Sequence, residues 1–249
     1  MNENNIVKGL LMLLLFYVVQ IVGTILYIVI ANAQGINPID GMFTAAGGNA
    51  VMLGLLIPEL IILIILARRY KSEIKQSLKY VVDNKRVTII KVIVYTVILF
   101  LFLNIAMVVD NNFFAEYVTE TGENEELLQA IMSSGITIPT FLVIAVTGPI
   151  FEEYIFRYGL MKKLFGKLNV YAAAIISTVI FAFIHIGFAQ IFSNEIGYTL
   201  HLFLLYIPIS LVLNLIYARE DDLFLPICIH IINNTLSILV SVYALSVLI

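Results

Sequence analysis

Two adjacent carboxylates, Glu152 and Glu153, and an arginine, Arg157, lie inside an otherwise apolar stretch from about residue 136 to residue 160. An ionisable side chain in a membrane-spanning segment costs about 2.5 kcal/mol or more, so it normally faces a bundle interior or a hydrated cavity. Because Glu153 and Arg157 are four residues apart, they share a helix face and can form an ion pair. Glu152 is rotated by about 100° from Glu153 and lacks that partner. The spacing predicts a structural role for Glu153 and leaves Glu152 free for chemistry.

Two later apolar segments carry residue pairs with the same four-residue spacing. His230 and Asn234 present an imidazole and an amide to one point, and Phe181 is expected to pack beside His185. Each of these alone has a simpler explanation, such as a hydrogen-bonded core histidine or an interhelical amide contact. Together with Glu152 they place an acid, two imidazoles and an amide on three segments. Helix packing alone does not require this set, so we interpret it as a candidate site.

The other polar residues of the apolar segments receive no catalytic assignment. Simple interhelical hydrogen bonding is expected for the lone amides and for His201, and Cys228 is interpreted as a small apolar helix residue. One cysteine also excludes an internal disulfide. The acidic cluster is interpreted as solvated, because runs of like charge usually face water. The residues concerned are Glu59, Asn104, Asn214 and Asn233, and the acidic residues Asp110, Glu116, Glu120, Glu123, Glu125 and Glu126.

The composition places these residues in a membrane protein. The chain is 61% hydrophobic and 12% charged, whereas a soluble domain carries about twice that charge fraction. A transmembrane helix needs roughly 20 mostly apolar residues. The sequence has about seven such blocks, near residues 6–31, 50–67, 87–109, 136–160, 170–186, 200–218 and 224–249. They predict an all-α, polytopic bundle of seven or eight spans in a single integral membrane domain, 1–249, with the first block retained rather than cleaved as a signal peptide.

The basic residues indicate the orientation. Lys and Arg accumulate in short cytoplasmic loops. With a cytoplasmic amino terminus, every basic residue falls on that side, and residues 32–48, 110–135 and 187–199 contain neither Lys nor Arg. In this arrangement Glu152 and His230 lie toward the cytoplasmic ends of their spans. His185 lies nearer the outer end of its own, so the sequence alone leaves their meeting in doubt.

The three motifs in order resemble the CAAX protease and bacteriocin-processing family (CPBP, or Abi) of intramembrane endopeptidases, related to CAAX prenyl endopeptidases of the Ras-converting-enzyme type. The family pattern, E-E-x-x-x-R, F-x-x-x-H and H-x-x-x-N or D, appears here across about residues 137–239. The resemblance implies a catalytic core at 136–249 behind variable N-terminal helices at 1–135.

The resemblance implies peptide hydrolysis by a glutamate-activated water in the membrane. Glu152 would be the general base on a water that His185 also holds, and His230 and Asn234 would donate to the oxyanion. A supporting shell would consist of Glu153, Arg157 and Phe181. No cofactor is obligatory in this scheme. A divalent metal such as zinc, held by Glu152, His185, His230 and Asn234, is the alternative, although the chain has no H-E-x-x-H motif.

The expected substrates are hydrophobic or lipid-associated peptides, because these partition into the bilayer beside the site. The relevant partners are the lipid bilayer and such a peptide, with no nucleic acid and no indication of oligomeric state. The composition suggests a bacterial cytoplasmic membrane. Two alternatives remain: a non-catalytic bacteriocin-immunity or scaffold protein of this fold, and a proton-coupled transporter, although no inverted repeat of broken helices is evident.

Overall fold

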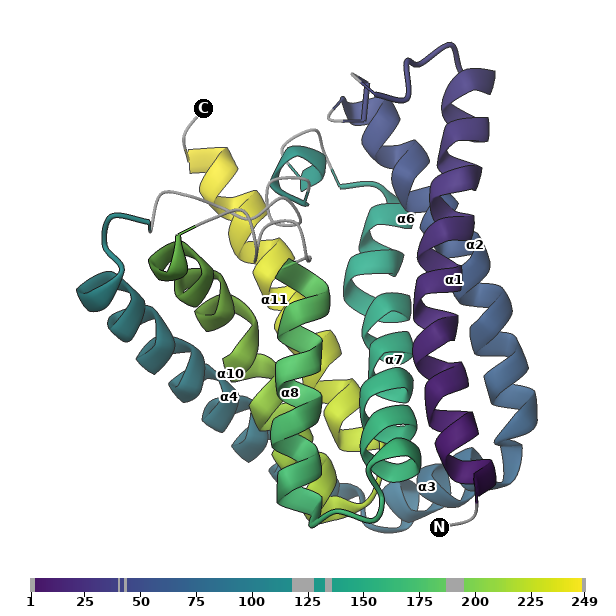
Figure 1. The fold of residues 1–249 in the computed structure, drawn as a ribbon, viewed down its shortest axis with the longest axis vertical. Helices are drawn as coiled ribbons and strands as arrows, with labels where there is room; N and C mark the ends of the chain where they lie inside the picture. Colours follow the sequence, from purple (N-terminus) through teal and green to yellow (C-terminus); the bar gives the residue numbers. More distant parts are fainter. Residues whose placement is uncertain are drawn as a thin grey trace.

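The computed structural model describes residues 3–39, 41–42, 44–117, 128–132, 136–186 and 195–247, and within them the chain is helical and contains no strand. The helices form an elongated bundle with most axes running along its length (Figure 1). The elements are α1 (Glu3–Ala33), α2 (Ala45–Arg69), α3 (Lys71–Asp83), α4 (Lys85–Phe113), α6 (Ile138–Phe141), η1 (Leu142–Thr147), α7 (Gly148–Glu153), η2 (Tyr154–Leu164), α8 (Val170–Ile186), α10 (Ile196–Glu220) and α11 (Phe224–Val247).

The prediction of an all-α polytopic bundle is confirmed. Six of the described helices are long and apolar enough to cross a membrane, and α8 is a shorter apolar helix of 17 residues. Large apolar side chains such as Leu14, Ile61 and Leu101 are more than half exposed on these helices, as lipid-facing residues would be. The chain is therefore a multi-pass membrane protein.

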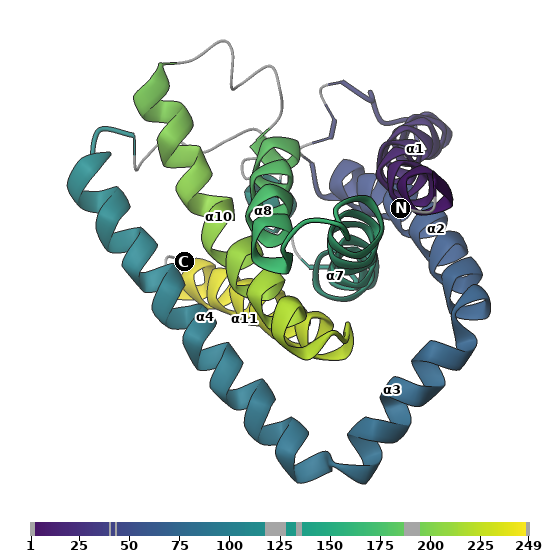
Figure 2. The same ribbon diagram turned by 60° about the horizontal axis from the view of Figure 1, so that its bottom comes forward.

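The basic stretch between the second and third predicted spans forms the helix α3. None of its residues is buried, and it connects α2 to α4 at one end of the bundle (Figure 2). Its polar composition hides an amphipathic pattern, because Ile74 and Leu78 repeat at helical spacing about 100° around the helix from Lys75 and Lys79. A hydropathy count misses such a helix.

One end of the bundle collects the basic residues. Here α1, α4, α8 and α11 begin and α2, η2 and α10 end, and we call it the basic end. Two ion pairs join its helices, Lys91 to Glu220 at 2.6 Å and Lys162 to Asp221 at 2.9 Å. By the positive-inside rule, the basic end is expected to face the cytoplasm.

The fourth span, Ile138–Leu164, lies centrally between α1 and α2 on one side and α8, α10 and α11 on the other (Figure 2). It alternates between α-helical and π-helical segments, and π-helical turns are frequent at functional sites. The part of this span nearest the basic end packs closely on α1, because Gly9 and Gly159 lie at the contact and have no side chains. A Cβ atom at Gly9 would lie 2.7 Å from Cβ of Leu164, and one at Gly159 would lie 3.0 Å from Cβ of Met12.

The main core draws on both halves of the chain. Phe16 of α1 stacks on Phe151 of α7 with ring centroids 6.1 Å apart, and Leu99 of α4 is buried in the same cluster. The N-terminal helices thus pack directly against the helix that carries Glu152. Most of the acidic cluster, residues 118–127, lies outside the described residues.

Candidate active site

Glu152, His185 and His230 come together from three different helices. Nε2 of His185 lies 3.7 Å from Oε1 of Glu152, and Nε2 of His230 lies 3.8 Å from Oε2 of the same carboxylate. The Glu152 and His185 side chains are 20% and 16% exposed, whereas that of His230 is 4% exposed. One carboxylate therefore faces two imidazoles in a mostly enclosed space.

His185 reaches Glu152 although the sequence places it nearer the outer end of its span. Because α8 has only 17 residues, its last turn, which carries His185, lies level with α7. Glu152 itself lies near the middle of the 27-residue fourth span rather than at its end. A count of residues from the loops suggests a mismatch because it assumes that all spans have equal length.

The ring of His185 is oriented by its own helix. Nδ1 lies 2.8 Å from the carbonyl oxygen of Phe181, and a carbonyl can only accept, so Nδ1 carries the hydrogen. In the neutral ring, Nε2 then has a free lone pair directed toward Glu152. The Phe181 ring stacks on the imidazole with centroids 4.0 Å apart and planes at 24°, as the spacing predicts.

The ring of His230 is oriented by Glu153. Nδ1 of His230 lies 2.8 Å from Oε1 of Glu153, and Oε2 of Glu153 lies 3.0 Å from Nε of Arg157. The side chains of Glu153 and Arg157 are fully buried. The predicted ion pair is therefore present, but Glu153 also binds the imidazole that faces Glu152. This second contact joins helices that are 77 residues apart in sequence, and the spacing gives no sign of it.

Arg157 links the first motif to the second as well. Its guanidinium carbon lies 5.8 Å from the centre of the Phe181 ring, within the range of a cation–π contact. Its Nη2 donates to the carbonyl oxygen of Ser210 at 3.4 Å. Arg157, Phe181 and His185 thus form a continuous stack behind Glu152.

Asn234 is held by two hydrogen bonds. Its Nδ2 donates to the carbonyl oxygen of Ile144 in η1 at 2.8 Å, and its Oδ1 accepts from Nδ2 of Asn233 at 3.1 Å. An amide nitrogen has two hydrogens, so one remains for another acceptor. The third sequence motif predicts Asn234 as a site residue, but the bond from Asn234 to Ile144 depends on how η1 lies against α11.

Glu59 is a buried carboxylate that the sequence reasoning left out of the site. It is 4% exposed, accepts a hydrogen bond from the hydroxyl of Thr147, and lies close enough to Glu152 for an electrostatic interaction. The signal available in the sequence was its place inside an apolar segment. It has no polar neighbour at helical spacing, and its partner is on another helix.

The remaining in-span polar residues have hydrogen bonds of a structural kind. Asn214 of α10 donates to Thr178 of α8 at 2.8 Å, which is the interhelical bond expected for such amides. Asn104 instead donates to the carbonyl oxygen of Phe100 in its own helix at 2.7 Å, so the expectation of an interhelical bond is wrong for this residue. His201 lies 2.8 Å from Oδ1 of Asp110. The interpretation of Asp110 as a solvated acid is therefore wrong, because this carboxylate is 8% exposed and bound to a buried imidazole. The Cys228 thiol is free and partly buried.

The site residues do not fit a metal centre as they stand. No group of three or more His, Cys, Asp or Glu side chains in the described ranges could hold a metal ion. The amide of Asn234 is also engaged on both its oxygen and its nitrogen. We therefore derive no chemical step through a metal.

Comparison with known proteins agrees with the motifs. Residues 134–236 match the model of a family described as type II CAAX prenyl endopeptidase Rce1-like, and all three motifs lie within this range. This part of the chain is similar to the Rce1-like family, and the match covers less than half of the chain. The resemblance found in the sequence is thereby confirmed, and the helices from α6 to α11 carry the Rce1-like region.

Curated relatives extend the similarity beyond the Rce1-like region. A Bacillus subtilis (strain 168) protein named "Putative membrane peptidase YdiL" is 31% identical over 120 residues, which are 48% of this chain and 44% of that protein. The UPF0177 protein YajF of Lactococcus lactis is 26% identical over 181 residues, 71% of this chain and 76% of that protein. The chain thus spans less than half the length of the Bacillus relative. No solved structure matches the chain.

Proposed function

We propose that this protein is an intramembrane endopeptidase that hydrolyses membrane-associated peptides or protein tails with a water activated by Glu152. The observation that carries the proposal is the position of the Glu152 carboxylate, which faces Nε2 of both His185 and His230. The match to the Rce1-like family model and the similarity to a Bacillus protein named as a putative membrane peptidase support peptidase activity.

The space around Glu152 suits a water molecule. Separations of 3.7 and 3.8 Å exceed direct hydrogen-bond distance, and polar groups so placed are commonly bridged by water. A water about 2.8 Å from both Glu152 and His185 donates one hydrogen to each, since both present lone pairs. Glu152 takes up the proton as the water oxygen attacks the peptide carbonyl carbon.

The negative charge that develops on the carbonyl oxygen needs donors. With its Nδ1–H held by Glu153, the ring of His230 can carry a proton on Nε2, and the buried carboxylate stabilises the resulting positive charge. The free hydrogen of Asn234 is the second donor. Collapse of the tetrahedral intermediate breaks the carbon–nitrogen bond, and Glu152 returns its proton to the leaving nitrogen.

The substrates we propose are hydrophobic or lipid-associated peptides, because Glu152 lies within a span where a soluble chain does not reach it. The relatives from Bacillus and Lactococcus support a place in a bacterial cytoplasmic membrane, with the basic end inside. No metal is obligatory in this scheme.

The deciding experiment compares the native protein with Glu152→Gln after reconstitution into vesicles. Cleavage of membrane-associated peptides is followed by mass spectrometry, and Glu116→Gln, at an exposed acid in the turn after α4, is the matched control. We expect the native protein and the control to cleave and Glu152→Gln to be inactive. Equal cleavage by all three contradicts the role of Glu152. No cleavage by the native protein across the peptide set favours a non-catalytic immunity or scaffold role.

A chelator tests the metal-free part of the proposal. The native protein is purified, dialysed against a strong chelator and assayed with the same peptides. We expect its activity to persist. Loss of activity that only a divalent ion restores would replace the glutamate-activated water with a metal-bound one.

A further inference from the structure

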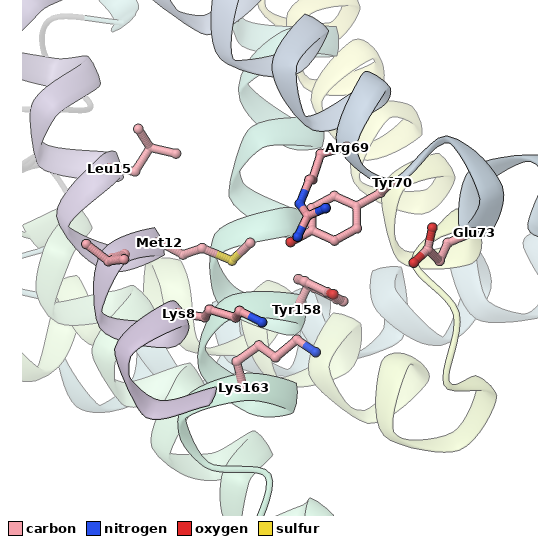
Figure 3. Close-up of a pocket in the computed structure, with 9 residues that line it drawn as sticks. Lys8, Met12, Leu15, Arg69, Tyr70, Glu73, Tyr158 and Lys163 are labelled. Atoms are coloured by element: carbon pink, nitrogen blue, oxygen red, sulfur yellow. The ribbon is translucent and has the colours of Figure 1, made fainter. Parts of the chain in front are cut away.

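A cavity lies at the basic end, lined by residues other than those of the Glu152 site. It has a volume of about 550 Å³ and lies between α1, the junction of α2 and α3, and η2. The ammonium groups of Lys8 and Lys163 and the guanidinium of Arg69 are directed toward the same space (Figure 3). Three cations from three separate elements therefore converge on one cavity.

Anionic partners are few around these cations in the described part of the chain, and the Glu73 carboxylate attracts Arg69 and Lys163 without forming an ion pair with either. Within the described residues none of Lys8, Arg69 and Lys163 forms an ion pair, although Lys163 lies 4.7 Å from the centre of the Tyr158 ring. The lining contains one carboxylate, Glu73, which accepts a hydrogen bond from the Ser72 hydroxyl at 2.6 Å. Cations outnumber carboxylates three to one, so the cavity favours an anion.

Two tyrosines add neutral donors to the same wall. The rings of Tyr70 and Tyr158 meet edge to face with centroids 5.0 Å apart. Burial, with a contribution from the Tyr158 hydroxyl, raises the pKa of Tyr70 to about 12. Tyr70 therefore keeps its proton at neutral pH and can donate a hydrogen bond to an anionic oxygen.

The opposite wall is apolar. It consists of Leu11, Met12 and Leu15 of α1, and Leu11 is 56% exposed on the surface that faces the lipid. Lys8 is one to two helical turns closer to the basic end than these residues, and Arg69 is the last residue of α2. The cations thus lie where the spans end, and the apolar wall continues from them into the membrane.

We propose that this cavity binds an anionic phospholipid, with the phosphate between Lys8, Arg69 and Lys163 and an acyl chain along Leu11 and Leu15. Basic pockets between transmembrane helices on the cytoplasmic side suit lipid headgroups of this kind. A free phosphate shares the headgroup chemistry but leaves the apolar wall uncovered. The lipid holds together the ends of α1, α2 and η2. This proposal does not depend on the peptidase activity.

The test measures lipid binding to the purified full-length protein in detergent by native mass spectrometry. Phosphatidylglycerol and phosphatidylcholine with identical acyl chains are titrated, and inorganic phosphate is added as a competitor. We expect phosphatidylglycerol to bind about tenfold tighter than phosphatidylcholine, and equimolar inorganic phosphate not to displace it. Lys8→Gln and Lys163→Gln should each weaken phosphatidylglycerol binding about fivefold, since one basic group near a lipid surface contributes that much.

Lys75→Gln is the matched control, because Lys75 is an exposed lysine of α3 that does not line the cavity. It should bind phosphatidylglycerol as the native protein does. Equal affinity for the two lipids, or an equal loss in Lys75→Gln and Lys163→Gln, would overturn the proposal. Displacement by inorganic phosphate would assign the cavity to a free anion instead. Phosphatidylcholine binding and the thermal unfolding midpoint of each variant separate a lost site from a misfolded protein.

Discussion

Glu153 binds Nδ1 of His230 at 2.8 Å, while Glu152, its neighbour in sequence, faces Nε2 of the same ring. The two adjacent glutamates of one helix thus lie next to opposite nitrogens of one imidazole ring. Glu153 also pairs with Nε of Arg157 at 3.0 Å, and a carboxylate placed between a guanidinium and an imidazole accepts from both. The tautomer and orientation of His230 therefore depend on a residue outside the reaction space. In the proposed mechanism Glu153 is a positioning residue.

Replacing Glu153 with Gln should lower kcat sharply while leaving Glu152 in place. The Gln amide can present an N–H to Nδ1 of His230, which favours the wrong tautomer. The loss of the equivalent carboxylate in a catalytic triad lowers kcat by about 10⁴-fold, and we expect a loss of about 10³-fold or more here. The measurement is kcat and KM on a peptide that the native protein cleaves. A loss of less than tenfold, in protein that remains folded, would contradict the positioning role.

The same ion pair gives a prediction about stability that separates folding from catalysis. Glu153→Gln leaves the fully buried Arg157 without its counter-ion, which should cost roughly 3–5 kcal/mol of unfolding free energy. The double variant Glu153→Gln with Arg157→Met removes both charges and should recover most of that loss. Its kcat should stay low, because His230 is still not held. Recovery of activity along with stability would show that the pair acts only through folding. Unfolding in detergent and peptide cleavage are measured on the same preparations.

Part of this structure is predictable from the sequence because the forces involved are local. The length of an apolar block determines whether it spans, and the block at 170–186 coincides with α8. Contacts at four-residue spacing, such as the stacking of Phe181 on His185, follow from helix geometry alone. The motif residues of the candidate site could therefore be named in advance.

The contacts that assemble the site were not predictable in this way. The bond from Glu153 to His230 and that from Asn234 to Ile144 depend on how two helices lie against each other. The π-helical turns of η1 and η2 also rotate side chains away from the positions that an ideal α-helix would give them. Glu59 was passed over for the same reason, because Thr147 becomes its partner only through packing.

The stack behind His185 predicts a modest and specific effect for Phe181→Leu. Aromatic pairs contribute about 0.5–1.5 kcal/mol beyond their burial, so kcat should fall about two- to tenfold as the imidazole becomes less well held. Phe183→Leu is a matched control on the same helix, because the Phe183 ring packs on Phe203 instead. It should lower the unfolding temperature without lowering kcat. Equal effects of the two changes on kcat would mean that the ring of Phe181 serves packing alone.

The remaining hydrogen on the Asn234 amide predicts how Asn234→Asp should behave. The carboxylate cannot donate, so Ile144 loses its partner and the proposed oxyanion loses a donor. Removal of one oxyanion donor lowers kcat by about 10²- to 10³-fold, and because this contact forms in the transition state, KM should change little. Asn233→Asp introduces the same charge one residue earlier and removes only the bond to Oδ1 of Asn234, so its kcat should fall by less than about tenfold. A raised KM with unchanged kcat in Asn234→Asp would place the amide in substrate binding. Steady-state kinetics with one peptide distinguish these outcomes, because a group that acts only in the transition state lowers kcat without changing KM.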